Sequence, residues 1–123
     1  MSRNSFASPR HSLQLLTLLI AIASGCHAPH EVELHPEIKA SPRAGVSVTN
    51  RDSFTYPGVT IFVKGHYSAE AGDLAPGQTV SFPFDRFVND EGEHFDISTM
   101  KPEVIRVRAW FDGKAVTKFF EVK

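Results

Sequence analysis

Three histidines near residue 30 are the first side chains in this sequence that could do chemistry. His27, His30 and His35 lie within nine residues, and imidazole nitrogens are suitable ligands for zinc and copper. Their spacing matches no zinc signature, however, and Pro29 and Pro36 interrupt the segment, so it supplies no fixed geometry. We therefore predict no dedicated metal site and no cofactor, and regard the three histidines as weak metal-binding candidates only.

An acidic stretch after residue 84 is the second place where chemistry could occur. Five carboxylates lie between Asp85 and Asp96, and carboxylates are the usual ligands of calcium. A calcium loop of the EF-hand type needs acidic or amide residues at alternate positions before a glycine, but the positions before Gly92 include Phe87. We interpret the sequence Asn-Asp-Glu-Gly that ends at Gly92 as an ordinary turn.

Nucleophilic catalysis has little support in the sequence. The chain contains a single cysteine, no Gly-x-Ser-x-Gly elbow and no glycine-rich phosphate loop. Catalytic triads are defined by geometry rather than by spacing, so the function of a small hydrolase stays open as an alternative. We predict that the protein is not an enzyme.

One segment near the end of the chain combines cationic and aromatic side chains on a single side. Arg106, Arg108 and Trp110 occupy alternate positions, and Phe119 lies across from Arg106 if the chain folds back as a hairpin. Arginine and tryptophan are enriched at the energetic centres of interfaces, and an exposed guanidinium over an aromatic ring contributes about 0.5–1 kcal/mol. If the protein has a binding face, we predict that these four residues form it. The alternative is a structural role, with Trp110 covered by another segment.

The single cysteine follows a segment typical of secreted proteins. Arg3 and Arg10 precede an apolar run of 11 residues, 13–23, and the small residues Ala-Ser-Gly come directly before Cys26. A spanning helix needs about 20 apolar residues, whereas a secretory signal needs about 7–15; the alternative is an uncleaved buried helix. The arrangement resembles the lipobox of bacterial lipoproteins. This resemblance implies cleavage before Cys26, diacylglycerol on its thiol and a further acyl chain such as palmitate on its amine.

The expected mature chain, residues 26–123, carries 11 basic and 14 acidic residues. Its length fits one domain, and its negative charge disfavours nucleic-acid binding, which depends on neutralising phosphates. Cys26 has no partner for an intrachain disulfide, and lipidation accounts for such an odd cysteine in a secreted chain. We predict a lipid-anchored protein of the bacterial cell envelope with an envelope protein as candidate partner. The residue after the cysteine is His27 rather than an aspartate. This choice resembles that of enterobacterial lipoproteins that go to the outer membrane by default.

Apolar residues recur at every second position from Gly45 onward, which is the signature of half-buried strands. A weaker pattern occurs at 68–70, and no segment after residue 43 shows a long helical stripe. The strands that we expect with most support lie within 46–49, 59–64, 79–84, 105–111 and 116–120.

The register of the last two strands follows from the turn between them. Asp112-Gly113 favours a two-residue type I′ hairpin, which sets Ala109 against Val116 and Ile105 against Phe120. A three-residue turn would instead place two like charges directly opposite each other, which is unfavourable. We therefore predict the two-residue turn.

Three segments resemble the bacterial immunoglobulin-like domains of secreted and envelope proteins. They are V-x-V-x-N at residues 46–50, V-x-I-x-V at 59–63, and Leu-Ala-Pro-Gly at 74–77, which corresponds to the L-x-P-G turn of that family. The resemblance implies an all-β, immunoglobulin-like antiparallel β-sandwich, which needs about seven strands. It implies no catalytic residues.

The predicted organisation has three parts. Residues 1–25 form a cleaved signal peptide, residues 26–43 a lipidated N-terminus and tether, and residues 44–123 the sandwich. The tether is predicted from its three prolines, with a short edge strand near Val32 and Leu34.

The segment 85–102 is longer than most loops, because loops beyond about 12–15 residues are uncommon. It contains five large apolar residues, too many for a solvated coil, and we predict that it folds back to cap one end of the sandwich, with a helical turn near 86–89. The apolar residues are Phe87, Val88, Phe95, Ile97 and Met100.

These observations favour a membrane-anchored envelope lipoprotein with a small binding or scaffolding sandwich whose ligand the sequence does not identify. The alternative is a metal-handling lipoprotein that uses His27, His30 and His35.

Overall fold

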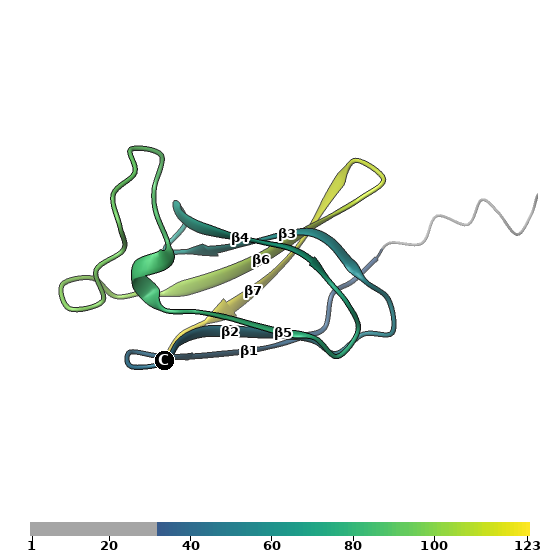
Figure 1. The fold of residues 1–123 in the computed structure, drawn as a ribbon, viewed down its shortest axis with the longest axis horizontal. Coiled ribbons are helices and arrows are strands. Elements are labelled where there is room, and N and C mark those ends of the chain that lie inside the picture. Colours follow the sequence, from purple (N-terminus) through teal and green to yellow (C-terminus); the bar gives the residue numbers. More distant parts are fainter. Residues whose placement is uncertain (1–31) are drawn as a thin grey trace, which may run out of the picture. The chain divides into compact units, whose positions relative to one another are not determined.

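Two antiparallel sheets pack face to face in the computed structural model, which describes residues 32–123 (Figure 1). One sheet has the strand order β1-β2-β5 and the other the order β4-β3-β6-β7. The predicted all-β sandwich is therefore confirmed, while the predicted signal peptide, Cys26, His27 and His30 lie outside the described residues. The strands are β1 (Pro36–Ser41), β2 (Gly45–Asn50), β3 (Tyr56–Val63), β4 (Tyr67–Leu74), β5 (Thr79–Phe82), β6 (Val104–Phe111) and β7 (Lys114–Glu121).

The β6–β7 hairpin has the register that its turn predicts. Ala109 pairs with Val116 and Ile105 pairs with Phe120. Asp112 and Gly113 have φ angles of 51° and 79°, and a type I′ turn requires a positive φ at both of its central residues. The prediction of a two-residue turn is confirmed.

The core consists of the inward residues of both sheets. Side chains alternate between the two faces of a strand, so Val46 and Val48 of β2 face the four-stranded sheet, while Ile105 and Val107 of β6 face the three-stranded sheet. All four are fully buried. The strand phases that period two predicts for β2 and β6 are those that the structure shows.

The start of the sandwich differs from the sequence-based expectation. Residues 26–43 are predicted to be a lipidated N-terminus and tether with a short edge strand near Val32 and Leu34. The strand instead forms at Pro36–Ser41, as β1, and pairs along its whole length with β2. Leu34 and Ile38 are buried in the core. Proline is tolerated here because β1 is an edge strand.

The segment 85–102 folds back against the sandwich, as predicted. Phe87 and Phe95 are buried in the core, and the ring centroid of Phe95 lies 5.3 Å from that of Tyr67. Val88 bridges to Ser68 at the edge of β4. The helical turn precedes its predicted position: it is a 3-10 helix at Phe84–Arg86.

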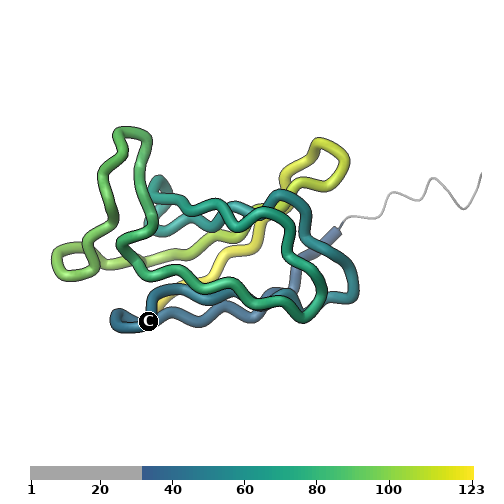
Figure 2. Tube along the Cα trace, in the orientation of Figure 1, coloured from purple at the N-terminus to yellow at the C-terminus, as the bar shows by residue number. Residues whose placement is uncertain are grey.

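The β6–β7 turn and the segment 85–102 lie at opposite ends of the sandwich (Figure 2). β6 begins at Val104, whose carbonyl accepts the N–H of Lys64 in the β3–β4 turn, and ends at Phe111. The segment 85–102 bridges to β4 close to that same β3–β4 turn. An eight-residue strand spans about 26 Å, so the two ends are well separated.

Candidate binding face

The outward side of β6 carries three of the four predicted binding residues. Arg106, Arg108 and Trp110 alternate with the buried Ile105, Val107 and Ala109. Both arginines are half-buried, and 42% of Trp110 is exposed. Sequence periodicity therefore placed these residues on the correct side of the strand.

Phe119 completes the predicted set from the neighbouring strand. It pairs with Arg106 in the β6–β7 register, and 64% of its surface is exposed. Phe119 has the largest exposed fraction of the three exposed large hydrophobic residues within 32–123. The structure thus brings all four predicted residues together on one sheet face.

A fifth residue, Phe62 of β3, organises this face and was not predicted. Phe62 pairs with Arg106 across the β3–β6 ladder. The Cζ atoms of Arg106 and Arg108 lie 3.9 Å and 4.9 Å from the centroid of its ring, and Arg108 Cζ also lies 5.0 Å from that of Trp110. We call the five residues Phe62, Arg106, Arg108, Trp110 and Phe119 the cation–aromatic face.

The two guanidinium groups have no close carboxylate partner among the described residues. Within residues 32–123, no carboxylate lies within 4.0 Å of Arg106 or Arg108, whereas Lys64 Nζ lies 3.1 Å from a carboxylate oxygen of Glu103. The Nε atom of Arg108 is buried and has no hydrogen-bond partner among the described atoms. Same-side positions on a strand are roughly 6.6 Å apart, so two like charges stand close together and favour a bound anion.

Trp110 is accessible because no described segment covers it. The segment 85–102 bridges to β4 at the opposite end of the sandwich. The indole lies beside Gly58, where an added Cβ would lie 3.5 Å from Trp110 Cδ1, an ordinary van der Waals distance. Within residues 32–123 the alternative in which another segment covers Trp110 is therefore not what the structure shows.

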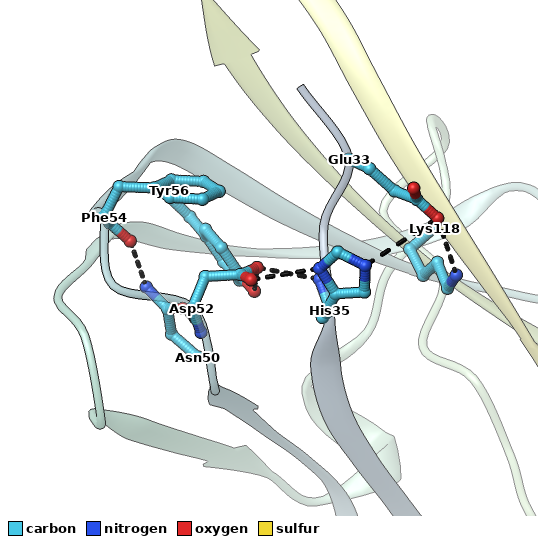
Figure 3. A network of polar contacts seen from close by, with 7 residues as sticks. All are labelled: Glu33, His35, Asn50, Asp52, Phe54, Tyr56 and Lys118. Atoms are coloured by element: carbon cyan, nitrogen blue, oxygen red, sulfur yellow. Dashed lines mark hydrogen bonds and ion pairs between the residues drawn. The ribbon is translucent and has the colours of Figure 1, made fainter. Parts of the chain in front are cut away.

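A network of polar groups fixes the chain where it enters β1 (Figure 3). Oδ2 of Asp52 accepts hydrogen bonds from the N–H of His35 at 2.8 Å and from the hydroxyl of Tyr56 at 2.6 Å. His35 Nδ1 lies 3.0 Å from the other Asp52 oxygen. These contacts join the segment before β1 to the loop between β2 and β3.

Asn50 supports this network from the core. Its side chain is fully buried, and its amide nitrogen donates hydrogen bonds to the carbonyl oxygens of Phe54 at 2.8 Å and Leu74 at 2.9 Å. Its Oδ1 accepts the N–H of Asp52 at 2.8 Å. Asn50 therefore holds the β2–β3 loop against the end of β4.

The network shifts two pKa values in opposite directions. Partial burial alone would raise the pKa of Asp52, but the hydrogen bonds from Tyr56 and His35 outweigh it, so the pKa of that carboxyl is lowered. The pKa of Tyr56 is raised, first by burial and then by its hydrogen bond to Asp52. Ionised Asp52 and neutral Tyr56 are the forms that stabilise the fold.

This network is suited to holding structure. The hydroxyl of Tyr56 is committed to Asp52, and Tyr56 is fully buried. His35 Nε2 lies 3.8 Å from an oxygen of Glu33, so each ring nitrogen faces a carboxylate. Of the weak metal-binding candidates only His35 lies within the described residues, and residues 32–123 contain no group of three side chains that could hold a metal ion.

The acidic turn is organised by an amide side chain. Oδ1 of Asn89 accepts the backbone N–H groups of Glu91 and Glu93 at 3.0 Å and 2.9 Å. Gly92 has a φ of 80°, which suits a turn. Asn89 thus fixes the turn that the sequence indicates.

An apolar hollow of about 440 Å³ lies at the insertion end and is separate from the cation–aromatic face. None of the five face residues lines it. Its lining includes Phe84, Ile97, Met100, Pro102 and Val122.

The remaining findings concern membrane-spanning helices and the comparison with known proteins. Within the part of the chain that the structure describes, no helix is long and apolar enough to cross a membrane. Searches against protein-family models, curated proteins and solved structures found no match to this chain.

Proposed function

We propose that the protein is a lipid-anchored component of the bacterial cell envelope whose sandwich binds a partner through the cation–aromatic face. We infer further that the sandwich is of the immunoglobulin-like type. Seven strands in two sheets support this type, as does the V-x-V-x-N strand that ends at the buried Asn50. The arrangement differs from constant-type domains, because β4 pairs with β3 rather than with the sheet of β1, β2 and β5.

The proposed anchor is supported by the order of basic, apolar and small residues before Cys26. It is also supported by the composition of the sandwich, since residues 32–123 contain no cysteine with which Cys26 could form a structural disulfide. The test is mass spectrometry of the mature N-terminus in the membrane fraction. We expect a triacylated N-terminal cysteine at position 26, and an intact Met1–Lys123 chain would refute the anchor.

The observation that carries the proposed binding function is the pair of stacked guanidinium groups without carboxylate partners in the described structure. Arg106 and Arg108 share the ring of Phe62, and Trp110 and Phe119 extend the surface on either side. Interfaces concentrate their binding energy in a few aromatic and arginine residues surrounded by groups that exclude water. The five residues provide such a centre on an open sheet face.

Site-specific crosslinking in intact cells tests this function. A photoreactive amino acid at Phe119 should crosslink to a discrete partner, and the same group at Lys39 should not. Lys39 is an exposed residue of β1, on the other sheet, and is a matched control for exposure. Crosslinks of equal yield and identity from both positions would exclude the cation–aromatic face as the binding surface.

A further inference from the structure

Two of the three exposed large hydrophobic residues within 32–123 lie at one end of the sandwich. Trp110 and Phe111 lie at the end of β6 beside the β6–β7 turn. Phe54, in the β2–β3 loop, is 37% exposed, and its ring centroid lies 5.9 Å from that of Phe111. The third, Phe119, lies on the cation–aromatic face opposite Arg106, nearer the start of β6.

The chain enters the sandwich at this same end. The hydrogen bonds of His35 to Asp52 place the segment before β1 beside the β2–β3 loop that carries Phe54 (Figure 3). An oxygen of Glu33 lies 3.9 Å from Lys118 Nζ of β7. Val32 to His35 therefore lie next to the aromatic end, and the segment 85–102 lies at the other end.

The length of chain before Val32 limits how far this end can stand from a lipid on Cys26. Six residue steps separate Cys26 from Val32. A fully extended chain spans at most about 3.3–3.6 Å per residue, so the separation is about 22 Å or less. This step rests on the proposed anchor, and it keeps the aromatic end close to the bilayer, whereas the insertion end has no such limit.

Charged side chains of both signs lie at both ends of the domain. Arg106 and Arg108, which have no carboxylate within 4.0 Å among the described residues, lie on the face that reaches the aromatic end. At the far end, Asp90, Glu91 and Glu93 are exposed at the tip of the insertion, and Arg43 and Lys101 are exposed near it. The face and its end also carry acidic groups. Of these, Asp52 binds Tyr56, Asp73 accepts the N–H of Gly58, and Glu70, Asp112 and Glu121 are exposed.

We propose that the aromatic end and the cation–aromatic face dock onto the anionic bilayer surface that holds the anchor. Trp110, Phe54 and Phe119 insert at the level of the lipid headgroups, where tryptophan is enriched in membrane proteins. Arg106 and Arg108 bind lipid phosphates, and their aliphatic stems lie along the aromatic rings. A flat sheet face suits an extended lipid surface, whereas small molecules favour concave sites.

Trp110 is the single tryptophan of the chain, so its fluorescence reports this contact directly. The mature chain 26–123 with Cys26→Ser carries no lipid and contains every core residue of the described sandwich. We expect the fluorescence emission of Trp110 to shift to shorter wavelength when the protein binds vesicles of phosphatidylglycerol and phosphatidylcholine. We also expect lipids brominated on their acyl chains to quench this emission. Vesicles of phosphatidylcholine alone should bind at least tenfold more weakly.

Matched variants assign the binding to this face. Arg106→Gln with Arg108→Gln should weaken binding to the anionic vesicles at least tenfold, and Phe54→Ser should reduce the quenching. Arg43→Gln with Lys101→Gln removes two exposed charges at the insertion end and should change the affinity less than twofold. Circular dichroism verifies that each variant is folded.

Three results would overturn lipid docking. They are the absence of a spectral shift with anionic vesicles, equal weakening by the two double variants, and crosslinks from Phe119 that reach a protein but no lipid. The last result would leave the proposed binding function intact with a protein as the partner. Conversely, failure to find a lipidated Cys26 would refute the anchor and leave the vesicle measurements valid, so the two proposals fail separately.

Discussion

The ring of Phe62 on β3 lies beneath the guanidinium of Arg106 on β6, with Arg106 Cζ 3.9 Å from the ring centroid. The two residues are direct partners in the β3–β6 ladder. The same ring also contacts Arg108, whose Cζ lies 4.9 Å from its centroid. One phenylalanine therefore positions both cations of the proposed binding surface.

Replacing Phe62 with leucine should loosen both arginines while keeping most of the buried apolar volume. Each stacking contact contributes about 0.5–1 kcal/mol at an exposed site, so we expect the free energy of unfolding to fall by about 1–2 kcal/mol in urea denaturation. Phe119→Leu is the control, because Phe119 makes no cation–aromatic contact among the described residues. An equal loss in the control would show that the stacking is energetically unimportant.

Val107→Asp should unfold the domain, whereas Arg108→Ala should have a small effect. Val107 is fully buried, and an unpaired charge there costs several kcal/mol. Arg108→Ala removes two stacking contacts but also removes a buried Nε without a partner, so we expect a loss of about 1 kcal/mol or less. Thermal denaturation followed by circular dichroism measures both, and similar losses would mean that the strand faces are exchanged.

Gly45→Ala should be more destabilising than Gly65→Ala. Both glycines have positive φ, 90° and 87°, and both variants therefore incur a similar backbone cost of about 1–2 kcal/mol. An added Cβ at Gly45 would also overlap the backbone of Phe82 and Pro83, whereas the space around Gly65 is open within 4 Å. If the two variants unfolded with their midpoints at the same urea concentration, this result would contradict the close approach of β2 to the end of β5.

The strands that the sequence predicts well are those whose register and buried face depend on residues close by in the sequence. The two-residue turn at Asp112-Gly113 fixes the pairing of β6 with β7, and alternation fixes which side of β6 faces the core. β1 was assigned to the tether because of its prolines, and only its pairing with β2 shows that it belongs to the sheet. β4 was expected only at 68–70, because Glu70, Gly72 and Asp73 weaken its apolar alternation.

The candidate face could be predicted only in part for the same reason. Arg106, Arg108 and Trp110 share one strand, so their common side follows from period two. Phe62 and Phe54 join them through the pairing of β3 with β6 and through the β2–β3 loop, neither of which leaves a local signal. The strand order β4-β3-β6-β7 is the information that the sequence lacks.

Asp52→Asn should reduce the sensitivity of the fold to acid. Because the pKa of Asp52 is lowered in the folded state, its ionised form stabilises the fold above the unfolded pKa of about 3.9. That stabilisation is lost as the pH falls through the folded pKa. We expect the variant to be less stable than the wild type at pH 7 by about 1–3 kcal/mol, and the difference to shrink below about pH 4. Denaturation curves from pH 2 to 7 measure it, and a constant difference would exclude this role for Asp52.

Asn50→Asp should be strongly destabilising although the two side chains have nearly the same size. The buried amide of Asn50 donates to the carbonyl oxygens of Phe54 and Leu74, and a carboxylate would turn both hydrogen bonds into repulsive contacts between acceptors. We expect a loss of about 3 kcal/mol or more at pH 7. The loss should diminish in acid, because a protonated carboxyl is neutral and can donate one hydrogen bond.

Asn89→Asp is the matched control for this substitution. Oδ1 of Asn89 accepts two backbone N–H groups, which an aspartate oxygen can accept equally well. The substitution also removes the hydrogen bond that Nδ2 of Asn89 donates to a carboxylate oxygen of Glu93, but this pair is exposed, so we expect a change within about 1 kcal/mol. The measurement is the free energy of unfolding of both variants at pH 7 and pH 4. If Asn50→Asp proved as mild as Asn89→Asp, the β2–β3 loop would not depend on the buried amide, and the position of Phe54 beside Phe111 would need another cause.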